Sequence, residues 1–165
     1  MTVTERSFPV TDFNPELDLY IERHIKAKPE TVWRCWTDPK LFAEWFAPKP
    51  VKITDIEYEF RPGGKANLTM TLPDGTVMPL EGCVLEVEPA RRLVTTDALG
   101  SGYRPRGEPF LTAIIEFEPK DGGTLYKATA LHSSEEIRKR HEEMGFQDGW
   151  GTTLRQLDEL ATSLT

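Results

Sequence analysis

The sequence predicts a single α+β domain with a curved sheet of about seven antiparallel strands, two short helices and a long C-terminal helix over the concave face. Segments that alternate apolar and polar residues follow one another through hairpin-length turns, which is typical of an antiparallel meander. The last twenty residues instead place apolar residues three and four apart, as on one face of a helix. This helix is the one long amphipathic element available to bury the apolar face of the sheet.

The chain is expected to begin with an irregular arm and a first strand. Residues 1–16 are polar with scattered Pro and Asn, whereas residues 17–165 are expected to form the domain. Apolar and polar residues alternate over 17–25, which predicts a half-buried strand. Its polar positions, expected to face solvent, are Asp18, Glu22 and His24.

The period then changes to that of a helix. Pro29 suits a first helical position, and Asp38 followed by Pro39 suits an N-cap and a second helix start. Pro48 is expected to end this second helix. Four aromatic residues lie within this region, namely Trp33, Trp36, Trp45 and Phe46. Packing of the short helices onto the sheet is their simplest role, and Trp45 or Phe46 is a candidate for the mouth of a cavity.

A run of strands and turns follows. The expected strands are 51–60, 65–72, 77–89, 91–98, 111–119 and 124–132. The turns between them contain Gly and Pro, as in RPGG, PDGT and KDGG. The longest break, 99–110, also contains Tyr103, Arg104 and Arg106. A segment of this length is either a cavity lid or a surface loop, and the sequence leaves both open.

The C-terminal region predicts a short charged helix and then the long one. Ser133 and Glu136 have the spacing of a capping box. Gly145 is expected to let the chain turn between the helices, and Gly149 to let the long helix approach the sheet closely. The apolar stripe comprises Phe146, Trp150, Leu154, Leu157, Leu160 and Ala161, and the opposite face Arg155, Asp158 and Glu159.

Composition limits the classes of function. The 165 residues carry a net charge of −7, which argues against a nucleic-acid binder. The two cysteines, Cys35 and Cys83, have no metal-site or redox spacing and are expected to be buried thiols. The three histidines fall on different elements, so we expect no metal and no cofactor. Neither a secretory leader nor an apolar run of membrane-spanning length is recognisable, so we expect a cytoplasmic protein.

Several motifs together resemble one family. In order and spacing they resemble the activator-of-heat-shock-chaperone-ATPase-like (AHSA-type) branch of the START-like (SRPBCC) superfamily, from about Leu17 to Leu164. The motifs are AKPETVW, WTDPKLFAEWFAP, RPGGKANLTM, PDGT, EGCVLEVEPARRLVTTDA, GGT and a late GW with two leucines. The resemblance implies the helix-grip fold and a deep, largely apolar cavity. Superfamily relatives include lipid carriers, polyketide cyclases and hormone receptors, so the fold does not settle function.

Strand parity selects the candidate cavity residues. Lys127 should face water, which turns Tyr126 and His132 inward. The parity of 77–89 turns Glu81 inward as well, unless Gly82 marks a bulge. A buried carboxylate near an imidazole suits acid–base work, whereas a solvated rim position is the simpler interpretation. The expected ligand-binding residues are Trp45, Phe46, Met70, Met78, Glu81, Tyr103, Phe110, Tyr126, His132, Phe146 and Trp150.

Three functions follow from these patterns. The leading expectation is binding of an apolar or amphipathic small molecule between the sheet and the C-terminal helix. The second is a cyclase-, dehydratase- or hydrolase-like enzyme in the same cavity, which requires Glu81 and His132 to meet inside it. The third is a chaperone-interaction module, which needs an exposed docking face. A homodimer is compatible with each of them, and whether a reaction occurs stays open.

Overall fold

The computed structural model describes residues 12–165, so the expectation for residues 1–11 of the N-terminal arm lies outside the described residues. The longer strands are β1 (Asp18–Ile25), β2 (Lys52–Tyr58), β3 (Ala66–Thr71), β4 (Val77–Leu80), β5 (Cys83–Glu88), β6 (Arg92–Thr96), β9 (Thr112–Lys120) and β10 (Gly123–Leu131). The two-residue strands β7 (Leu99–Gly100) and β8 (Arg104–Pro105) flank a 3-10 turn, Ser101–Tyr103. The helices are α1 (Pro29–Thr37), α2 (Pro39–Trp45), α3 (Glu135–Glu143) and α4 (Phe146–Ser163).

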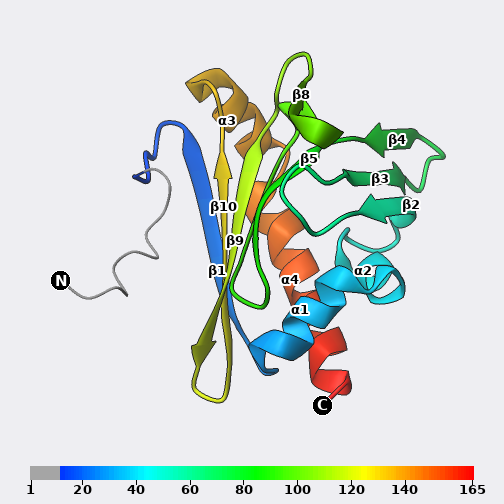
Figure 1. Cartoon of the computed structure of the whole chain (residues 1–165), viewed down its shortest axis with the longest axis vertical. Helices are drawn as coiled ribbons and strands as arrows, with labels where there is room; N and C mark the ends of the chain where they lie inside the picture. Colours follow the sequence, from blue (N-terminus) through cyan, green and yellow to red (C-terminus); the bar gives the residue numbers. More distant parts are fainter. Residues whose placement is uncertain (1–11) are drawn as a thin grey trace.

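The strands are antiparallel and the long helix covers one sheet face, which confirms the expected α+β class. Five strands pair in the order β1-β10-β9-β6-β5, and α4 and α1 lie on the same side of this sheet (Figure 1). The strands β2, β3 and β4 form a separate three-stranded sheet, drawn at the right of Figure 1 above α2. The structure therefore has the helix-grip arrangement, with the second sheet beside the two short helices.

The division into two sheets corrects one predicted element. The expected strand 77–89 is two strands, β4 and β5, which belong to different sheets. The strand is interrupted at Gly82, where a Cβ atom would lie 2.6 Å from the Thr96 carbonyl oxygen. Only glycine tolerates this approach, and the Asn67 side chain accepts a hydrogen bond from the Gly82 N–H (3.2 Å). The alternation of inward and outward side chains therefore does not continue through Gly82, and the Glu81 side chain faces outward.

Most helix boundaries agree with their sequence signals. Pro29 is the first residue of α1, and the Asp38 side chain accepts from the Lys40 N–H as the N-cap of α2. Gly145 has a φ of 91° at the junction of α3 and α4, as its expected role in the turn requires. The capping-box prediction is wrong by one residue, because Ser134, and not Ser133, caps α3 by accepting from the Ile137 N–H (3.2 Å).

Two acidic residues expected on polar faces are buried instead. Asp158 of α4 lies against β1, where it pairs with Arg23 (3.1 Å) and accepts from the Lys26 N–H (3.1 Å). Asp18 accepts from the Asn14 N–H (2.8 Å) beside the first strand. Both carboxylates have partners that compensate for lost hydration, which residue type alone does not reveal.

The close approach expected of Gly149 is also wrong. A Cβ atom at this position would meet no other atom within 4 Å, apart from the helix's own backbone and the neighbouring residues. Two residues further on, Gly151 would bring a Cβ atom to 3.9 Å from the Ile21 side chain, which is ordinary contact. The apolar face of α4 is nevertheless as predicted, with Phe146, Leu154 and Leu157 buried.

The core fills the space between the five-stranded sheet and α4. It combines side chains of the sheet, α1, α2 and α4, among them Trp36, Phe42, Trp45, Phe117, Tyr126, Leu154 and Leu157. Gln156 of α4 fixes the end of α2 by donating to the carbonyl oxygens of Trp45 (3.0 Å) and Ala47 (2.8 Å). The place where a ligand was expected thus holds packed side chains, and α2 is held at a defined position beside β2.

Candidate functional site

A pocket opens where the two short helices meet the second sheet. Its volume is about 170 Å³. The end of α1 and the start of α2 form one wall, and β2 with the residues that follow it forms the other. The lining residues are Trp36, Thr37, Pro39, Ile56, Glu57, Tyr58, Glu59, Phe60 and Lys65. We call it the aromatic pocket.

Three rings line this pocket. The ring centroids of Trp36 and Tyr58 are 6.2 Å apart, and those of Tyr58 and Phe60 are 5.9 Å apart. Behind them, Phe42 lies 5.2 Å from Tyr58 and Trp33 lies 5.6 Å from Phe60. The rings are therefore fixed by a second layer of aromatic side chains and present a pre-formed surface.

The hydroxyl groups of the buried Tyr126 and of the half-buried Tyr58 differ in their partners. The Trp36 Nε1–H donates to the Tyr126 hydroxyl (2.9 Å), which orients the indole ring. The Tyr58 hydroxyl, in contrast, makes no hydrogen bond with any residue from 12 to 165. Burial raises the pKa of both phenols, so both stay protonated over the physiological range. Tyr58 thus offers a ligand one neutral polar group within an apolar wall.

Charged side chains surround the opening. The Lys65 ammonium lies 3.6 Å from a Glu57 carboxylate oxygen, and Glu59 accepts from the Lys65 backbone N–H (2.9 Å). That backbone hydrogen bond, with smaller effects of Arg61 and Lys65, holds the pKa of Glu59 below its usual value. The pocket therefore combines an apolar interior with an ionised rim.

A second cluster lies around two buried histidines, and it gathers four of the predicted residues. The ring centroid of His141, on α3, lies 4.8 Å from that of Phe110 and 5.1 Å from those of Phe146 and His132. Trp150 completes the group at 5.9 Å from His141. The burial of His141 was not predicted, because charged residues surround it in the sequence.

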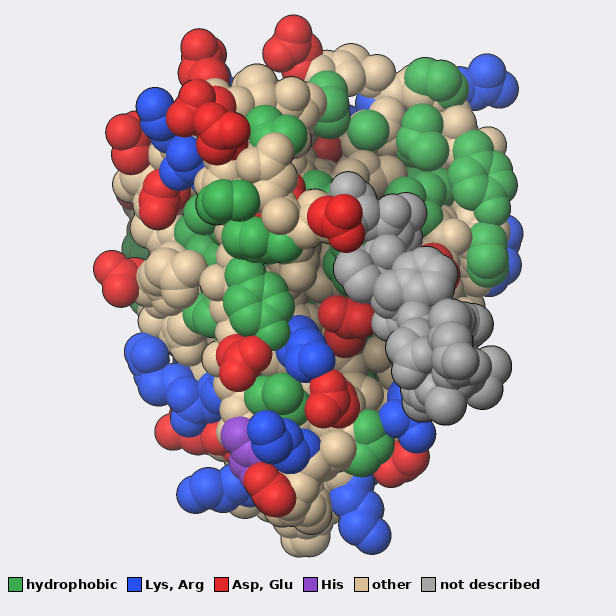
Figure 2. Space-filling view, turned by 90° about the vertical axis from the view of Figure 1, so that its left-hand side faces the viewer, with side chains coloured by type: hydrophobic (Ala, Val, Ile, Leu, Met, Phe, Trp, Pro, Cys, Tyr) green, Lys and Arg blue, Asp and Glu red, His purple; other side chains and the backbone are tan. Residues whose placement is uncertain are grey.

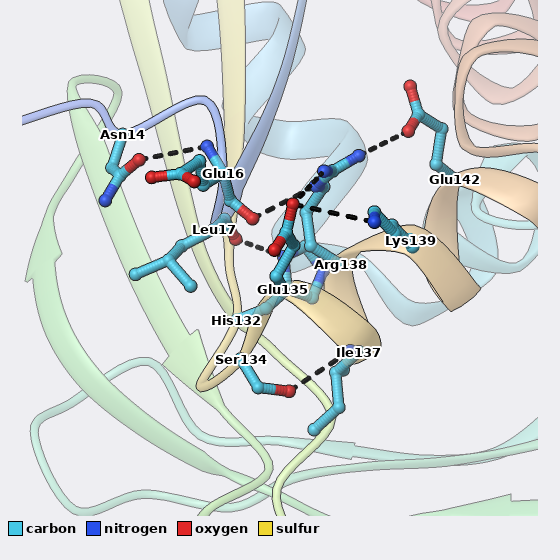
Figure 3. Close-up of polar contacts among 10 residues, drawn as sticks. All are labelled: Asn14, Glu16, Leu17, His132, Ser134, Glu135, Ile137, Arg138, Lys139 and Glu142. Carbon is cyan, nitrogen blue, oxygen red and sulfur yellow. Dashed lines mark hydrogen bonds and ion pairs between the residues drawn. The ribbon is translucent and has the colours of Figure 1, made fainter.

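The hydrogen bonds of this cluster define the histidine tautomers. His132 bonds to the Leu17 carbonyl oxygen through Nδ1 (2.7 Å), as Figure 3 shows, and to His141 Nδ1 through Nε2 (2.9 Å). A carbonyl oxygen only accepts, so His132 Nδ1 carries the proton, and when His132 is neutral its Nε2 accepts from His141 Nδ1–H. Burial, and then the neighbouring His132, lowers the pKa of His141 to about 4. The His141 imidazole is therefore neutral near pH 7.

This histidine pair holds the N-terminal segment on the sheet. The His132 backbone N–H also donates to the Leu17 carbonyl oxygen (3.1 Å), and Arg138 of α3 donates to the Glu16 carbonyl oxygen (3.1 Å), as Figure 3 shows. A hollow of about 560 Å³ beside it is lined by 12–15, Leu17, Asp18, Leu131 and His132. Its lining residues 12–15 are exposed, so fewer side chains converge there than in the aromatic pocket.

The expected acid–base pair does not form. The Glu81 side chain is 58% exposed and its nearest charged partner is Arg106 at 3.9 Å, whereas both ring nitrogens of the buried His132 bond elsewhere. No hydrogen bond or ion pair joins Glu81 and His132 among the described residues. The predicted inward orientation of Glu81 is wrong, because the strand is interrupted at Gly82. The enzyme mechanism that requires Glu81 and His132 to meet is therefore wrong as well.

None of the eleven predicted ligand residues lines the aromatic pocket. Trp45 and Tyr126 are fully buried in the core, so the expected place of Trp45 at a cavity mouth is wrong. Phe46 and Met70 are half-buried against the core. Met78 and Tyr103 are exposed on the second sheet and on the loop, and Glu81 is exposed after β4. The other four, Phe110, His132, Phe146 and Trp150, belong to the histidine cluster.

The loop 99–110 is fixed to the sheet at several points. Arg106 donates to the carbonyl oxygens of Glu81 (2.9 Å) and Asp97 (3.0 Å), and the Asp97 carboxylate accepts from the Phe110 N–H (2.8 Å). The ring of Tyr103 covers Gly63, where a Cβ atom would lie 2.9 Å from it. Of the two roles left open by the sequence, these contacts favour a surface loop over a lid.

The residues of the aromatic pocket had a signal in the sequence. Ile56, Tyr58 and Phe60 are two positions apart in the expected strand 51–60, so period two places them on one face. That pattern identifies a shared face but not the helices that lie opposite it. The pocket arises from the placement of α1 and α2 against β2, which no local pattern contains.

Other features of the described surface are consistent with a small globular domain. Acidic and basic side chains are interspersed on the face in Figure 2, with hydrophobic side chains between them. None of the helices within residues 12–165 is both long and apolar enough to cross a membrane. Over the same residues, no group of three or more His, Cys, Asp or Glu side chains is arranged to hold a metal ion.

Comparison with known proteins gives a consistent family. Residues 26–162 match the family described as activator of Hsp90 ATPase homolog 1-like protein. A crystal structure from Nitrosomonas europaea shares 44% identity, covers 92% of this chain and 97% of its own, and superposes with a TM-score of 0.88. A solution structure from Arthrobacter aurescens shares 26% identity over 93% and 92% of the two chains, with a TM-score of 0.78. No curated protein matches.

Proposed function

The chain belongs to the activator of Hsp90 ATPase homolog 1-like family of START-like proteins, and on that basis we propose that it binds an amphipathic small molecule in the aromatic pocket. The observation that carries the proposal is the Tyr58 hydroxyl in the aromatic wall of the pocket, which bonds to no residue from 12 to 165. A partly apolar pocket with a few placed polar groups is the usual form of a small-molecule site.

The size of the pocket limits what it holds. An apolar cavity of about 150 Å³ accepts benzene, so a pocket of 170 Å³ takes one ring or a compact branched group. Burial of carbon surface contributes about 25 cal/mol per Å² before the entropy costs of association. The remainder of such a ligand would extend past the charged rim into solvent. The proposed ligand therefore has a small apolar end and a polar end.

This binding mode predicts which variant loses affinity. Tyr58→Phe keeps the ring and removes the hydroxyl, so ligands that bond to it should bind about tenfold more weakly. Tyr103→Phe removes an exposed hydroxyl on the loop and is the matched control. We would measure thermal shifts with a panel of small amphipathic compounds, followed by titration of the compounds that bind.

Two results would contradict the proposal. The first is a complete absence of thermal shifts and of resonance shifts at pocket residues across the panel. The second is a binding compound whose affinity is the same for Tyr58→Phe and for Tyr103→Phe, with resonance shifts confined to residues away from β2. In that case the ligand site lies elsewhere in the domain.

Docking to a chaperone is the second candidate function, and one surface favours it. Val77, Met78 and Leu80 of β4 are 38–60% exposed and form an apolar strip at the edge of the second sheet. Pro79 lacks an N–H, so side chains rather than strand addition would carry such a contact. A pull-down with purified Hsp90-type chaperone should retain the native chain and lose the Met78→Ser variant. Equal retention of both would remove β4 as the docking surface.

A further inference from the structure

We propose that the aromatic pocket selects an organic cation, with a primary or methylated ammonium group against the rings of Trp36, Tyr58 and Phe60 and facing the carboxylates of Glu57 and Glu59. This inference rests on the proposed function, because it names the ligand class of the same pocket.

Three aromatic rings in the lining favour a cation. A cation is attracted to the negative face of an aromatic ring when it lies within about 6 Å of the ring centroid, and Trp is the strongest such partner. The centroids of Trp36 and Phe60 lie 6.2 Å and 5.9 Å from that of Tyr58, so one group in the pocket can contact all three rings. Recognition of methylated ammonium groups commonly uses such a cage. A trimethylammonium group is no larger than the single ring that a pocket of this volume admits.

The charge of the lining also favours a cation. It contains two carboxylates, Glu57 and Glu59, and one ammonium, Lys65, so its formal charge is 1 − 2 = −1. Lys65 is paired with Glu57 Oε2 at 3.6 Å, and Glu59 Oε1 accepts from the Lys65 backbone N–H and pairs with Arg61, which lies outside the lining, at 3.5 Å. The other oxygens, Glu57 Oε1 and Glu59 Oε2, have no hydrogen-bond or ion-pair partner among residues 12–165, so they can face a cation.

The orientation of α1 places its C-terminal end at the pocket. This nine-residue helix ends at the pocket, to which its last two residues, Trp36 and Thr37, contribute. The last carbonyl groups of a helix carry a partial negative charge, which favours a cation nearby. At the start of α2 the opposite partial charge is offset by the carboxylate of Asp38, which caps that helix.

Charge also distinguishes this class from the alternatives. An anion would face two carboxylates and the negative faces of the rings, so the site disfavours it. A neutral molecule of the same shape would gain from burial of carbon surface alone. The net charge of −7 on the whole chain further favours the approach of a cation.

A pair of probes with the same shape isolates the charge. Choline and its carbon isostere 3,3-dimethyl-1-butanol differ in the replacement of the ammonium nitrogen by carbon. In titrations followed by NMR, we expect choline to shift the side-chain resonances of Trp36 and Tyr58 and to bind at least tenfold more tightly than the isostere. Raising the salt concentration from 50 to 500 mM should weaken choline binding several-fold, because part of the attraction is screened.

Variants of the rim provide the matched test. Glu57→Gln and Glu59→Gln should each weaken choline binding about threefold to tenfold and leave the isostere unchanged. Glu44→Gln, which removes an exposed carboxylate of α2 outside the lining, should leave both unchanged. The carboxylates are exposed at the rim, so these substitutions are expected to preserve the fold.

The outcomes separate the inference from the proposed function. If the isostere binds in the pocket as tightly as choline, the cation inference is overturned and small-molecule binding stands. The same holds if neither probe binds and a neutral or anionic compound does. If no cation, anion or neutral compound perturbs the pocket residues, both proposals are overturned.

Discussion

At the scale of single residues, burial decides the protonation of His141. Its ring is 6% exposed and packs against Phe110, Phe146 and Trp150, while His132 is the titratable group that faces it. The pKa of His141 is about 4 in the folded protein, below the ordinary value of 6.5. The unfolded chain therefore binds a proton at a pH where the folded protein does not.

This difference predicts a pH dependence of stability. The stability associated with neutral His141 is present above pH 6.5 and is lost as the pH falls toward 4, by up to about 3 kcal/mol. Urea unfolding of the native chain between pH 7.5 and 4 measures the slope. His141→Phe should flatten it, since Phe fills the same ring cluster without titrating. His24→Gln, at an exposed histidine, is the control, and an unchanged slope in His141→Phe would remove this residue as the cause.

Asp158 is the other residue whose role depends on contacts distant in the chain. Its carboxylate joins α4 to β1 through Arg23, the Lys26 N–H and the Thr162 hydroxyl (3.3 Å). Asp158→Ala leaves a backbone donor and a half-buried guanidinium without their partner, so it should lower the free energy of unfolding by about 2 kcal/mol. Glu159→Ala, at the exposed neighbour, should change it by less than about 0.5 kcal/mol. Urea unfolding of both variants tests this, and equal effects would contradict it.

At the scale of elements, the helix starts were predictable and the sheet division was not. Proline at N1 and aspartate at the N-cap are local signals, and they placed α1 and α2 correctly. The interruption at Gly82 depends on the carbonyl group of Thr96 in another strand, so the glycine in the sequence indicated a bulge as one alternative but not the division into two sheets. The predicted inward orientation was correct for Tyr126, whose strand is uninterrupted, and wrong for Glu81, which directly precedes the interruption at Gly82.

The two glycines around the start of α4 have opposite predicted effects. At Gly149 an alanine Cβ meets open space within a helix, so Gly149→Ala should stabilise the protein by about 1 kcal/mol. Gly145 has a φ of 91°, which alanine adopts poorly, so Gly145→Ala should destabilise it by about 1 kcal/mol. Thermal unfolding of the two variants provides the comparison. If Gly149→Ala instead destabilised the protein, the result would contradict this prediction and indicate that residue 149 lies close to the sheet.

At the scale of the whole molecule, the fold was predictable and the site was not. The order of elements and their periods were sufficient to predict a sheet covered by a C-terminal helix, and the family match agrees with them. The space beneath that helix is filled by the core, and the aromatic pocket lies instead where α1 and α2 face β2. Its position depends on long-range contacts, such as those of Gln156 with the end of α2, which a pattern in one segment does not specify.

The central claim is that the aromatic pocket is the ligand site, and intermolecular NOEs test it most directly. For the compound of the panel that binds most tightly, the account predicts NOEs from ligand protons to the ring protons of Trp36, Tyr58 and Phe60. NOEs to Phe110, Phe146 and Trp150 instead, with none to the pocket rings, would place the ligand at the histidine cluster and contradict the claim.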